Sequence, residues 1–319
     1  MPQREGVSEA GVKPLKALVI HRDLPMKWAR LDGHFAYPVP EFTWDEQAVE
    51  KRFSLNLDRL DGCDFVWWDE GKYGQSRHFM GSRVPVVSQV QNFVVEAGML
   101  RAIIDRARQN GAVVAVGHGA LEPWQKAGLK AFSCLYSTNE QYYRPAEKTV
   151  DVGQYACWNY VYEREALDAW LADVCKRHGW TFGSNRGEWY QPNDYRDALA
   201  RTKVIVTISR WPESRPVRLL DISASGGVLL TNRWSEGGWP DDYPAFDKPN
   251  TAGHGTTNPG TMRYTDRDCA EIEARLVDLL TGGKWQDVAA RARQYVLEHD
   301  TWAVRAGELR GNLRKVLGL

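Results

Sequence analysis

Short apolar runs alternate with longer amphipathic segments along most of this 319-residue chain. The apolar runs have the composition and length of strands buried on both faces, and they lie at 16–21, 64–68, 84–88, 112–116, 131–136, 150–153, 181–183, 204–208 and 228–230. Apolar residues at helical spacing predict helices at 45–60, 92–110, 163–178, 193–201, 217–224, 266–280, 285–299 and 301–319. Because strands alternate with helices, we expect an α/β fold with parallel, doubly wound sheets.

The length of the chain and one break in this pattern indicate two domains. A chain of 319 residues is long enough for two domains with separate cores. The pattern breaks at 143–148, where a proline and mixed charges are typical of a linker. We therefore expect a polar tail at 1–13, a first Rossmann-like domain at 14–146 and a second at 147–319.

The most informative stretch, residues 203–232, reads KVIVTISRWPESRPVRLLDISASGGVLLTN. Its pattern is a buried strand, a polar loop, a short helix, a Gly-Gly stop and a second buried strand. Glycine ends a helix readily because it adopts the left-handed backbone conformation without a steric penalty from a Cβ. This order of elements predicts one βαβ unit of a parallel sheet.

The loop and helix of this unit carry two acids, Glu213 and Asp221, with seven residues between them. Ligands of open α/β sheets lie at the carboxyl ends of the strands, where helix N-termini offer free N–H groups to anions. A nucleotide diphosphate bound there would meet the backbone around Ser214, with Arg215 and Arg218 as counter-charges. A carboxylate farther along the helix could accept hydrogen bonds from ribose hydroxyls. The alternative is an ordinary structural βαβ unit whose acids are solvated.

Residues 212–232, PESRPVRLLDISASGGVLLTN, resemble the E-x7-E element of nucleotide-sugar glycosyltransferases with the GT-B fold, specifically the group-1 (GT4-like) and CgeB-like families. The resemblance implies two Rossmann-like domains that face each other across a cleft. It implies that Glu213 binds the donor sugar and that Asp221, shorter than the family's second Glu, binds the ribose. It also implies that the final helix crosses back to the first domain.

Positive charge for the leaving diphosphate is expected from arginines, because the resemblance implies metal-independent chemistry. The sequence has no DxD motif placed after a predicted strand and no metal-spaced His/Cys/Asp cluster, so no metal site is predicted. The Arg and Lys that the group-1 families supply at the start of the second domain are not evident. Arg210, Arg215 and Arg218 are therefore the candidates, with Arg164 and Arg186 as substitutes.

Candidate residues of the first domain follow predicted strands. His118 lies between two glycines after the strand at 112–116, where it could hydrogen-bond the donor sugar or the acceptor. Asp69 and Glu70 follow the strand at 64–68, where a carboxylate could orient or deprotonate an acceptor hydroxyl. His21 has the analogous position after the first strand. For each of these residues the alternative is a solvated loop side chain.

Charge, cysteines and hydropathy narrow the class of protein. The chain has 41 basic and 41 acidic residues, so it has no global basic field for a nucleic acid. Its five cysteines lack CxxC or zinc spacing, and we expect reduced thiols in a cytoplasmic protein. No apolar run approaches the roughly 18–20 residues of a membrane span.

We interpret the chain as a glycosyltransferase that moves a hexose from a nucleotide diphosphate sugar, with UDP-glucose as the expected donor, to an acceptor hydroxyl. The resemblance implies retention at the anomeric carbon, whereas an inverting enzyme would use Asp69 as its base. The acceptor stays open among a hydroxymethylated DNA base, a glycan, a protein and a small molecule. Two alternatives are a non-catalytic protein that binds a nucleotide sugar, and an epimerase or hydrolase of the same fold. No cofactor besides the donor is expected.

Overall fold

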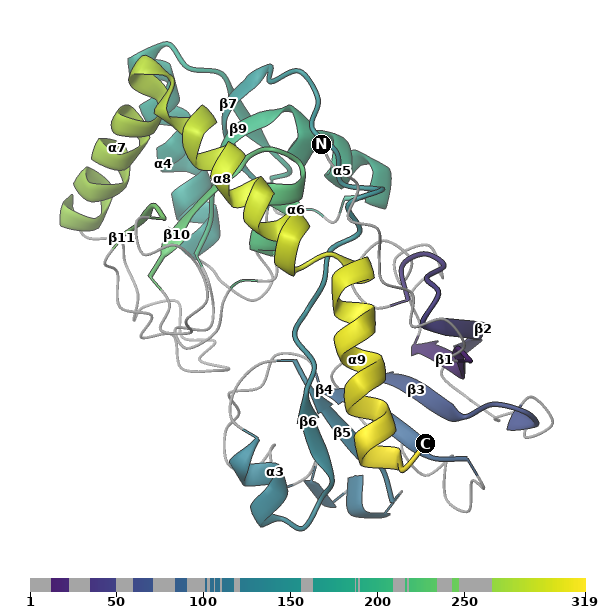
Figure 1. The fold of residues 1–319 in the computed structure, drawn as a ribbon. Coiled ribbons are helices and arrows are strands. Elements are labelled where there is room, and N and C mark those ends of the chain that lie inside the picture. Colours follow the sequence, from purple (N-terminus) through teal and green to yellow (C-terminus); the bar gives the residue numbers. More distant parts are fainter. Residues whose placement is uncertain are drawn as a thin grey trace.

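The computed structural model describes residues 13–22, 35–49, 60–70, 84–90, 101, 104–105, 107–109, 111–117, 121–155, 163–186, 188, 190–208, 216, 218–233, 243–246 and 266–319. Within these residues the chain forms two parallel β-sheets with helices packed around them (Figure 1). The predicted α/β class, with two parallel sheets, is confirmed. No helix in this part of the chain is long and apolar enough to cross a membrane.

The first sheet has six strands in the order β2-β1-β3-β4-β5-β6, and every pair is parallel. Its elements are β1 (Leu15–Arg22), β2 (Phe42–Val49), β3 (Phe65–Glu70), β4 (Val86–Val90), β5 (Val113–Val116), the short helix α3 (Glu122–Lys126) and β6 (Ala131–Ser133). The chain leaves β1 toward β2 on one side and continues from β3 to β6 on the other. The direction of winding therefore reverses between β1 and β3.

Strand β2 corrects one prediction, because residues 45–49 belong to this strand and not to a helix. Phe42 is buried, Thr43 is exposed, Trp44 is half-buried and Asp45 is exposed. This alternation has the period of a strand, whereas the spacing of apolar residues over 45–60 predicts a helix. β2 is an edge strand, and its Asp45 side chain is exposed while the backbone keeps its ladder with β1.

Both faces of the first sheet are covered. On one face, the C-terminal helix α9 (Trp302–Leu317) packs Trp302, Ala306, Leu309 and Leu313 against apolar side chains of β1, β3 and β5. Trp302 is fully buried, and its ring lies 5.9 Å from the Phe42 ring in a stacked arrangement. Trp124 of α3 and Ala107 pack on the opposite face. The last helix of the chain therefore belongs to the core of the first sheet (Figure 1).

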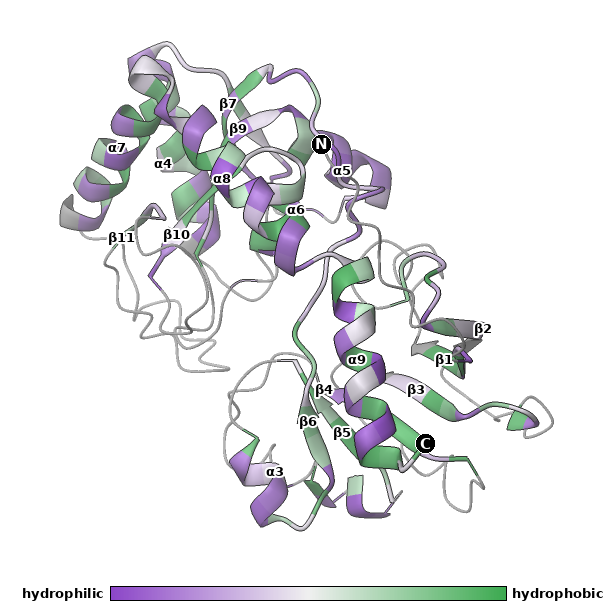
Figure 2. Cartoon of the chain, viewed as in Figure 1, coloured by the Kyte–Doolittle hydropathy of each residue, from purple (hydrophilic) through white to green (hydrophobic). Residues whose placement is uncertain are grey.

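The second sheet has the order β11-β10-β9-β7-β8, again with parallel pairs only. Its elements are β7 (Val150–Gln154), α4 (Glu163–His178), β8 (Phe182–Ser184), α5 (Pro192–Arg201), β9 (Thr202–Val206), α6 (Arg218–Ala224), β10 (Val228–Asn232), β11 (Ala245–Phe246), α7 (Asp266–Leu280), the 3₁₀ turn Thr281–Gly283 and α8 (Lys284–His299). Strands β9 and β10 are almost entirely buried, as their continuous apolar runs predict. Helices α7 and α8 each show a green apolar stripe beside a purple polar one (Figure 2).

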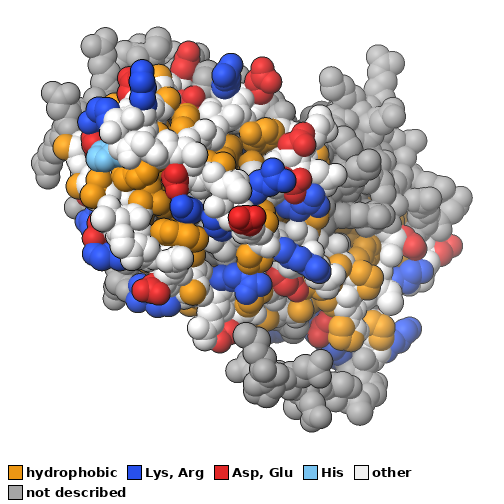
Figure 3. Space-filling view, turned by 90° about the horizontal axis from the view of Figure 1, so that it is seen from above, with side chains coloured by type: hydrophobic (Ala, Val, Ile, Leu, Met, Phe, Trp, Pro, Cys, Tyr) orange, Lys and Arg blue, Asp and Glu red, His pale blue; other side chains and the backbone are white. Residues whose placement is uncertain are grey.

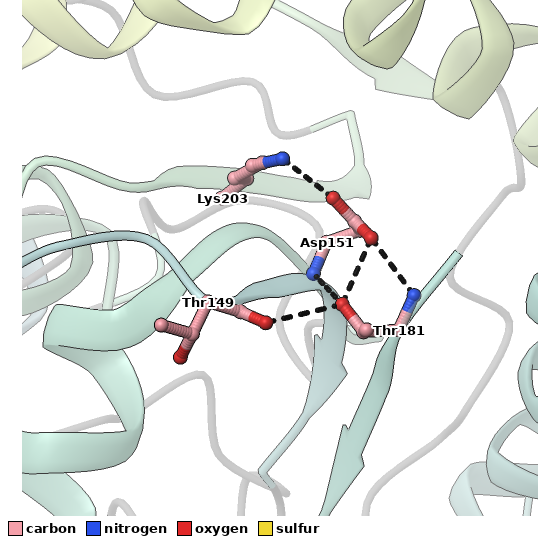
Figure 4. Close-up of polar contacts among 4 residues, drawn as sticks. All are labelled: Thr149, Asp151, Thr181 and Lys203. Atoms are coloured by element: carbon pink, nitrogen blue, oxygen red, sulfur yellow. Dashed lines mark hydrogen bonds and ion pairs between the residues drawn. The ribbon is translucent and has the colours of Figure 1, made fainter.

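A hydrogen-bonded network fastens the amino edge of this second sheet (Figure 4). The Asp151 carboxylate accepts hydrogen bonds from Thr181 N and Thr181 Oγ1, both at 2.8 Å, and from Lys203 Nζ at 2.6 Å. These bonds hold the pKa of Asp151 below its usual value, although partial burial opposes them. The network joins the first residues of β7 and β9 to the approach to β8. It lies at the edge opposite to the carboxyl ends of these strands.

Candidate functional site

The topology of the second sheet marks one place for a ligand. The β7–α4–β8 unit winds to one side of β7, and the β9–α6–β10 unit winds to the other side of β9. In open α/β sheets, ligands bind beyond the carboxyl ends of the strands where the winding direction reverses. The ends of β7 and β9 therefore form the candidate site.

Two arginines cross this switch point in opposite directions. Arg164 lies on α4, which follows β7, and its Nη2 donates to the carbonyl oxygen of Ile208 beyond β9 at 3.0 Å. Arg218 lies on α6, which follows β9, and its Nη1 donates to the carbonyl oxygen of Tyr155 beyond β7 at 2.6 Å. Each guanidinium group is thus anchored to the strand end opposite its own helix. The result is two cations at one switch point.

Arg218 brings positive charge to the site within the part of the chain that the structure describes. Arg164 is buried, and Arg218 is half-buried with its guanidinium carbon 6.0 Å from the centroid of the Tyr195 ring. Among the described residues, no carboxylate forms an ion pair with Arg218. Its bond to Tyr155 uses one of five N–H donors. A planar guanidinium group fixed in this way is suited to an anion with two oxygens, such as a phosphate.

Tyr155 sets the geometry of one side of the site, and two glycines make room for its ring. A Cβ built on Gly153 would lie 2.5 Å from Tyr155 Cε2, and one on Gly183 would lie 2.2 Å from Tyr155 Oη. The ring therefore lies flat across β7 and β8, with its hydroxyl 2.8 Å from Thr202 Oγ1 on β9. Burial raises the pKa of Tyr155 to about 12, so this phenol stays neutral.

Asp221 lies on α6, close to the same switch point. Its side chain is only 6% exposed, and Oδ1 accepts a hydrogen bond from Thr138 Oγ1 at 2.7 Å. Thr138 is fully buried in the segment that connects β6 to β7. The carboxylate thus has a fixed orientation, with one oxygen held by the connection between the two sheets.

Two further polar groups are buried where β7 and β9 end. Gln154 donates from Nε2 to the backbone oxygen of Arg164 at 3.4 Å, while its Oε1 has no hydrogen-bond partner among the described residues. Thr207, directly after β9, is 3% exposed, and its hydroxyl likewise lacks a partner within the described part of the chain. Buried polar atoms usually have hydrogen-bond partners. A ligand bound here could therefore form hydrogen bonds with Gln154 Oε1 and Thr207 Oγ1.

Several predicted site residues lie outside the described residues. These are His118, Arg210, Glu213, Ser214 and Arg215. Their roles remain predictions from the sequence. Of the predicted donor-site residues, the structure describes Asp221 and Arg218, and it brings the substitute candidate Arg164 to the same switch point. The other substitute, Arg186, is exposed beyond β8.

In the first sheet, the backbone of Asp69 and Glu70 belongs to the carboxyl end of β3, and His21 belongs to the end of β1. Ile20 is in register with Trp68, so His21 and Asp69 come next on adjacent parallel strands. Those two strands flank the place where the winding of the first sheet reverses. The topology thus places the backbone of His21, Asp69 and Glu70 at the carboxyl edge of the first sheet, the edge at which open α/β sheets bind ligands.

Thr138, Tyr155, Thr207 and Gln154 were missed by reasoning from the sequence. Gln154 and Thr207 could have been found, because each is a polar residue at the carboxyl end of an apolar strand: Gln154 is the last residue of β7, and Thr207 directly follows β9. Thr138 has no such signal, since its contact with Asp221 spans 83 positions. Among the described residues, no group of three or more His, Cys, Asp or Glu side chains could hold a metal ion.

Two doubly wound domains, with a basic switch-point site in the second, define the GT-B class of glycosyltransferases. Structures with this fold resemble the chain over nearly its whole length. A glycosyltransferase from Rickettsia africae aligns with a TM-score of 0.60 at 8% identity, covering 96% of this chain and 99% of its own. Sucrose-phosphate synthase from Thermosynechococcus elongatus aligns with a TM-score of 0.58 at 9% identity, covering 95% of this chain and 99% of its own.

Anabaena HepE, solved in complex with UDP-glucose, aligns with a TM-score of 0.56 at 10% identity, covering 94% of this chain and all of its own. At such identities these similarities establish the fold. A search of curated proteins found no match. The profile of the glycosyl transferase-like family matches residues 145–311, more than half of the chain, and the chain belongs to this family. The predicted GT-B resemblance and the assignment as a glycosyltransferase enzyme are both confirmed.

Proposed function

We propose that this glycosyltransferase transfers a hexose from UDP-glucose, or a closely related nucleotide diphosphate sugar, to an acceptor hydroxyl. The observation that carries the proposal is the crossed pair Arg164 and Arg218 at the switch point of the second sheet. Two fixed guanidinium groups offer charge and fork geometry to a diphosphate. HepE, which shares the fold, was solved with UDP-glucose, which supports a uridine nucleotide as the donor.

Each residue has a role in this proposal. Arg164 and Arg218 bind the diphosphate, Asp221 accepts hydrogen bonds from the ribose, and Glu213 binds hydroxyls of the donor sugar. During transfer, the bond between the anomeric carbon and the phosphate oxygen breaks, and a bond from that carbon to the acceptor oxygen forms. The acceptor proton passes to an oxygen of the departing phosphate, on the same face of the sugar, so that configuration is retained. The arginines stabilise the negative charge that develops on the leaving diphosphate.

The chemistry proposed here uses arginine charge in place of a divalent cation, so EDTA should leave the rate unchanged. The acceptor is a hydroxyl-bearing molecule that the loops of the first domain select. On the face in Figure 3, the described Lys and Arg side chains are mixed with Asp and Glu side chains, so this described part offers a polyanion no patch of positive charge alone. An acceptor screen should therefore include glycans, small hydroxylated molecules and proteins beside hydroxymethylated DNA.

Calorimetric titration of the purified protein with UDP tests the donor site. Arg218→Met removes one charged donor and should weaken UDP binding by about 1.5–3 kcal/mol, or roughly 10- to 150-fold. Arg177→Met is the matched control, since Arg177 pairs with Glu273 at the far end of α4 and should not change UDP affinity. Glu213→Ala should keep UDP affinity but abolish glucose transfer. No binding of UDP or any other nucleoside diphosphate by the wild-type protein would refute the proposal.

A further inference from the structure

The two connections between the sheets pair with each other. The chain passes from β6 to β7 through residues 134–149, and it returns from α8 to α9 through Asp300 and Thr301 (Figure 1). Thr138 and Thr301 form an isolated parallel bridge. Thr138 N donates to Asp300 O at 2.9 Å, and Trp302 N donates to Thr138 O at 3.1 Å. The two passages are therefore joined at this point by backbone hydrogen bonds, and together they form one unit.

This unit is also fastened to the first domain. Asp300 is fully buried, and its carboxylate pairs with Arg305 Nη2 of α9 at 2.5 Å. Trp302 Nε1 donates to the carbonyl oxygen of Tyr37 at 2.8 Å, and the Tyr37 hydroxyl bonds Glu140 Oε1 at 2.5 Å. A displacement at Thr138 is thus transmitted to α9 and to the sheet on which α9 packs.

The third hydrogen bond of Thr138 reaches the donor site. Its hydroxyl donates to Asp221 Oδ1 at 2.7 Å, and both side chains are at least nine-tenths buried. Thr138 therefore joins the first connection, which contains it, to the second connection and to α6 of the donor site. Because a carboxylate can accept several hydrogen bonds, Oδ1 can stay on Thr138 while a ligand donates to the same carboxylate.

We infer that Thr138 is a positioning residue that aligns the Asp221 carboxylate for the donor and transmits donor binding to the paired connections. The inference rests on the proposed function, because it needs a ligand at Asp221. Binding of a nucleotide strengthens the orientation of Asp221, and the bond to Thr138 carries this order into residues 138 and 300–302. Donor binding in the second domain thereby orders the connections to the first domain before the acceptor reacts.

Calorimetry and hydrogen exchange with UDP test this inference, using Thr138→Ala and Thr138→Ser. Thr138→Ala keeps the backbone pairing but removes the hydroxyl, so UDP affinity should fall about tenfold and Thr138→Ser should restore most of it. In the wild type, UDP should slow amide exchange at Thr138 and Trp302; in Thr138→Ala this response should disappear. Thr181→Val is the matched control, because Thr181 makes the same threonine–aspartate bond with Asp151 at the opposite edge of the sheet (Figure 4).

The outcomes separate this inference from the proposed function. If the wild-type protein does not bind UDP, the proposed donor site is wrong and the inference fails with it. If the wild type binds UDP and Thr138→Ala has unchanged affinity and an unchanged exchange response, the donor site stands and the role of Thr138 is refuted. An equal loss of affinity in Thr181→Val would show a general effect of stability and would also overturn the role. Should Thr138→Ala not fold, the isosteric Thr138→Val, which also lacks the hydroxyl, replaces it, and unchanged UDP affinity and exchange response in that variant would refute the role of Thr138.

Discussion

Substitution of Gly183 by alanine tests whether the packing of Tyr155 sets the geometry of the donor site. The new Cβ would lie 2.2 Å from Tyr155 Oη and 3.1 Å from both Tyr155 Cζ and Val150 Cγ1. Real Cβ atoms essentially never approach another heavy atom closer than 3.0 Å, so the buried tyrosine ring has to move. Overpacking of this kind costs about 1–3 kcal/mol, and loss of the Tyr155–Thr202 hydrogen bond adds about 1 kcal/mol. We expect Gly183→Ala to lower the free energy of unfolding by about 2–4 kcal/mol.

Urea unfolding measures this loss, and UDP titration measures its effect on the site. Tyr155 carries the carbonyl that holds Arg218, so a displaced Tyr155 should weaken UDP binding as well. Tyr155→Phe removes the colliding oxygen, so the double variant Gly183→Ala/Tyr155→Phe should be more stable than the sum of the single effects predicts. Gly307→Ala is the control: Gly307 lies in α9 with no atom near its Cβ position, and alanine should stabilise the helix by about 0.5–1 kcal/mol. If Gly183→Ala has wild-type stability, or if the losses in the double variant are additive, a Cβ at position 183 does not displace Tyr155, and the expected collision is wrong.

Two further predictions concern buried charges. Burial lowers the pKa of Lys148 to about 8 from 10.5, so the folded state loses the proton first. The free energy of unfolding should therefore rise with pH between about 8 and 10.5, relative to Lys148→Met measured in parallel; a constant difference would contradict the burial effect. Arg305→Met removes the cation bound to the fully buried Asp300 and should cost about 3–5 kcal/mol in thermal unfolding. Glu308→Gln breaks the exposed pair of the same arginine and should cost less than about 1 kcal/mol, so equal losses would be inconsistent with our account.

The local pattern of apolar and polar residues was sufficient to predict most helices and strands of the second domain. Helices α4 and α7 have the predicted bounds, and the strand–helix–strand order of residues 203–232 is present as β9, α6 and β10. These segments are buried on one side or both, so the spacing of their apolar residues matches the positions that face the core. Gly226 has the left-handed backbone conformation that ends α6, with φ of 70°.

Local pattern was misleading where tertiary contacts outweighed it. Residues 45–49 belong to a segment predicted as a helix, yet their backbone pairs with β1 as an edge strand of the sheet. Helical preference is worth only tenths of a kcal/mol per residue, so a hydrogen-bonded ladder with a buried neighbour overrides it.

The fold class and the βαβ unit that contains Asp221 and Arg218 could be predicted from the sequence, because these features depend on residues close together in the chain. Which cations lie together at the ends of β7 and β9 depends on the tertiary structure. Arg164 and Arg218 lie 54 positions apart, and each bonds a strand end supplied by the other's unit. The partnership of Asp221 with Thr138 across 83 positions likewise has no local signal. Such contacts follow from the order in which strands assemble into a sheet, and that order is set by the packing of the whole chain.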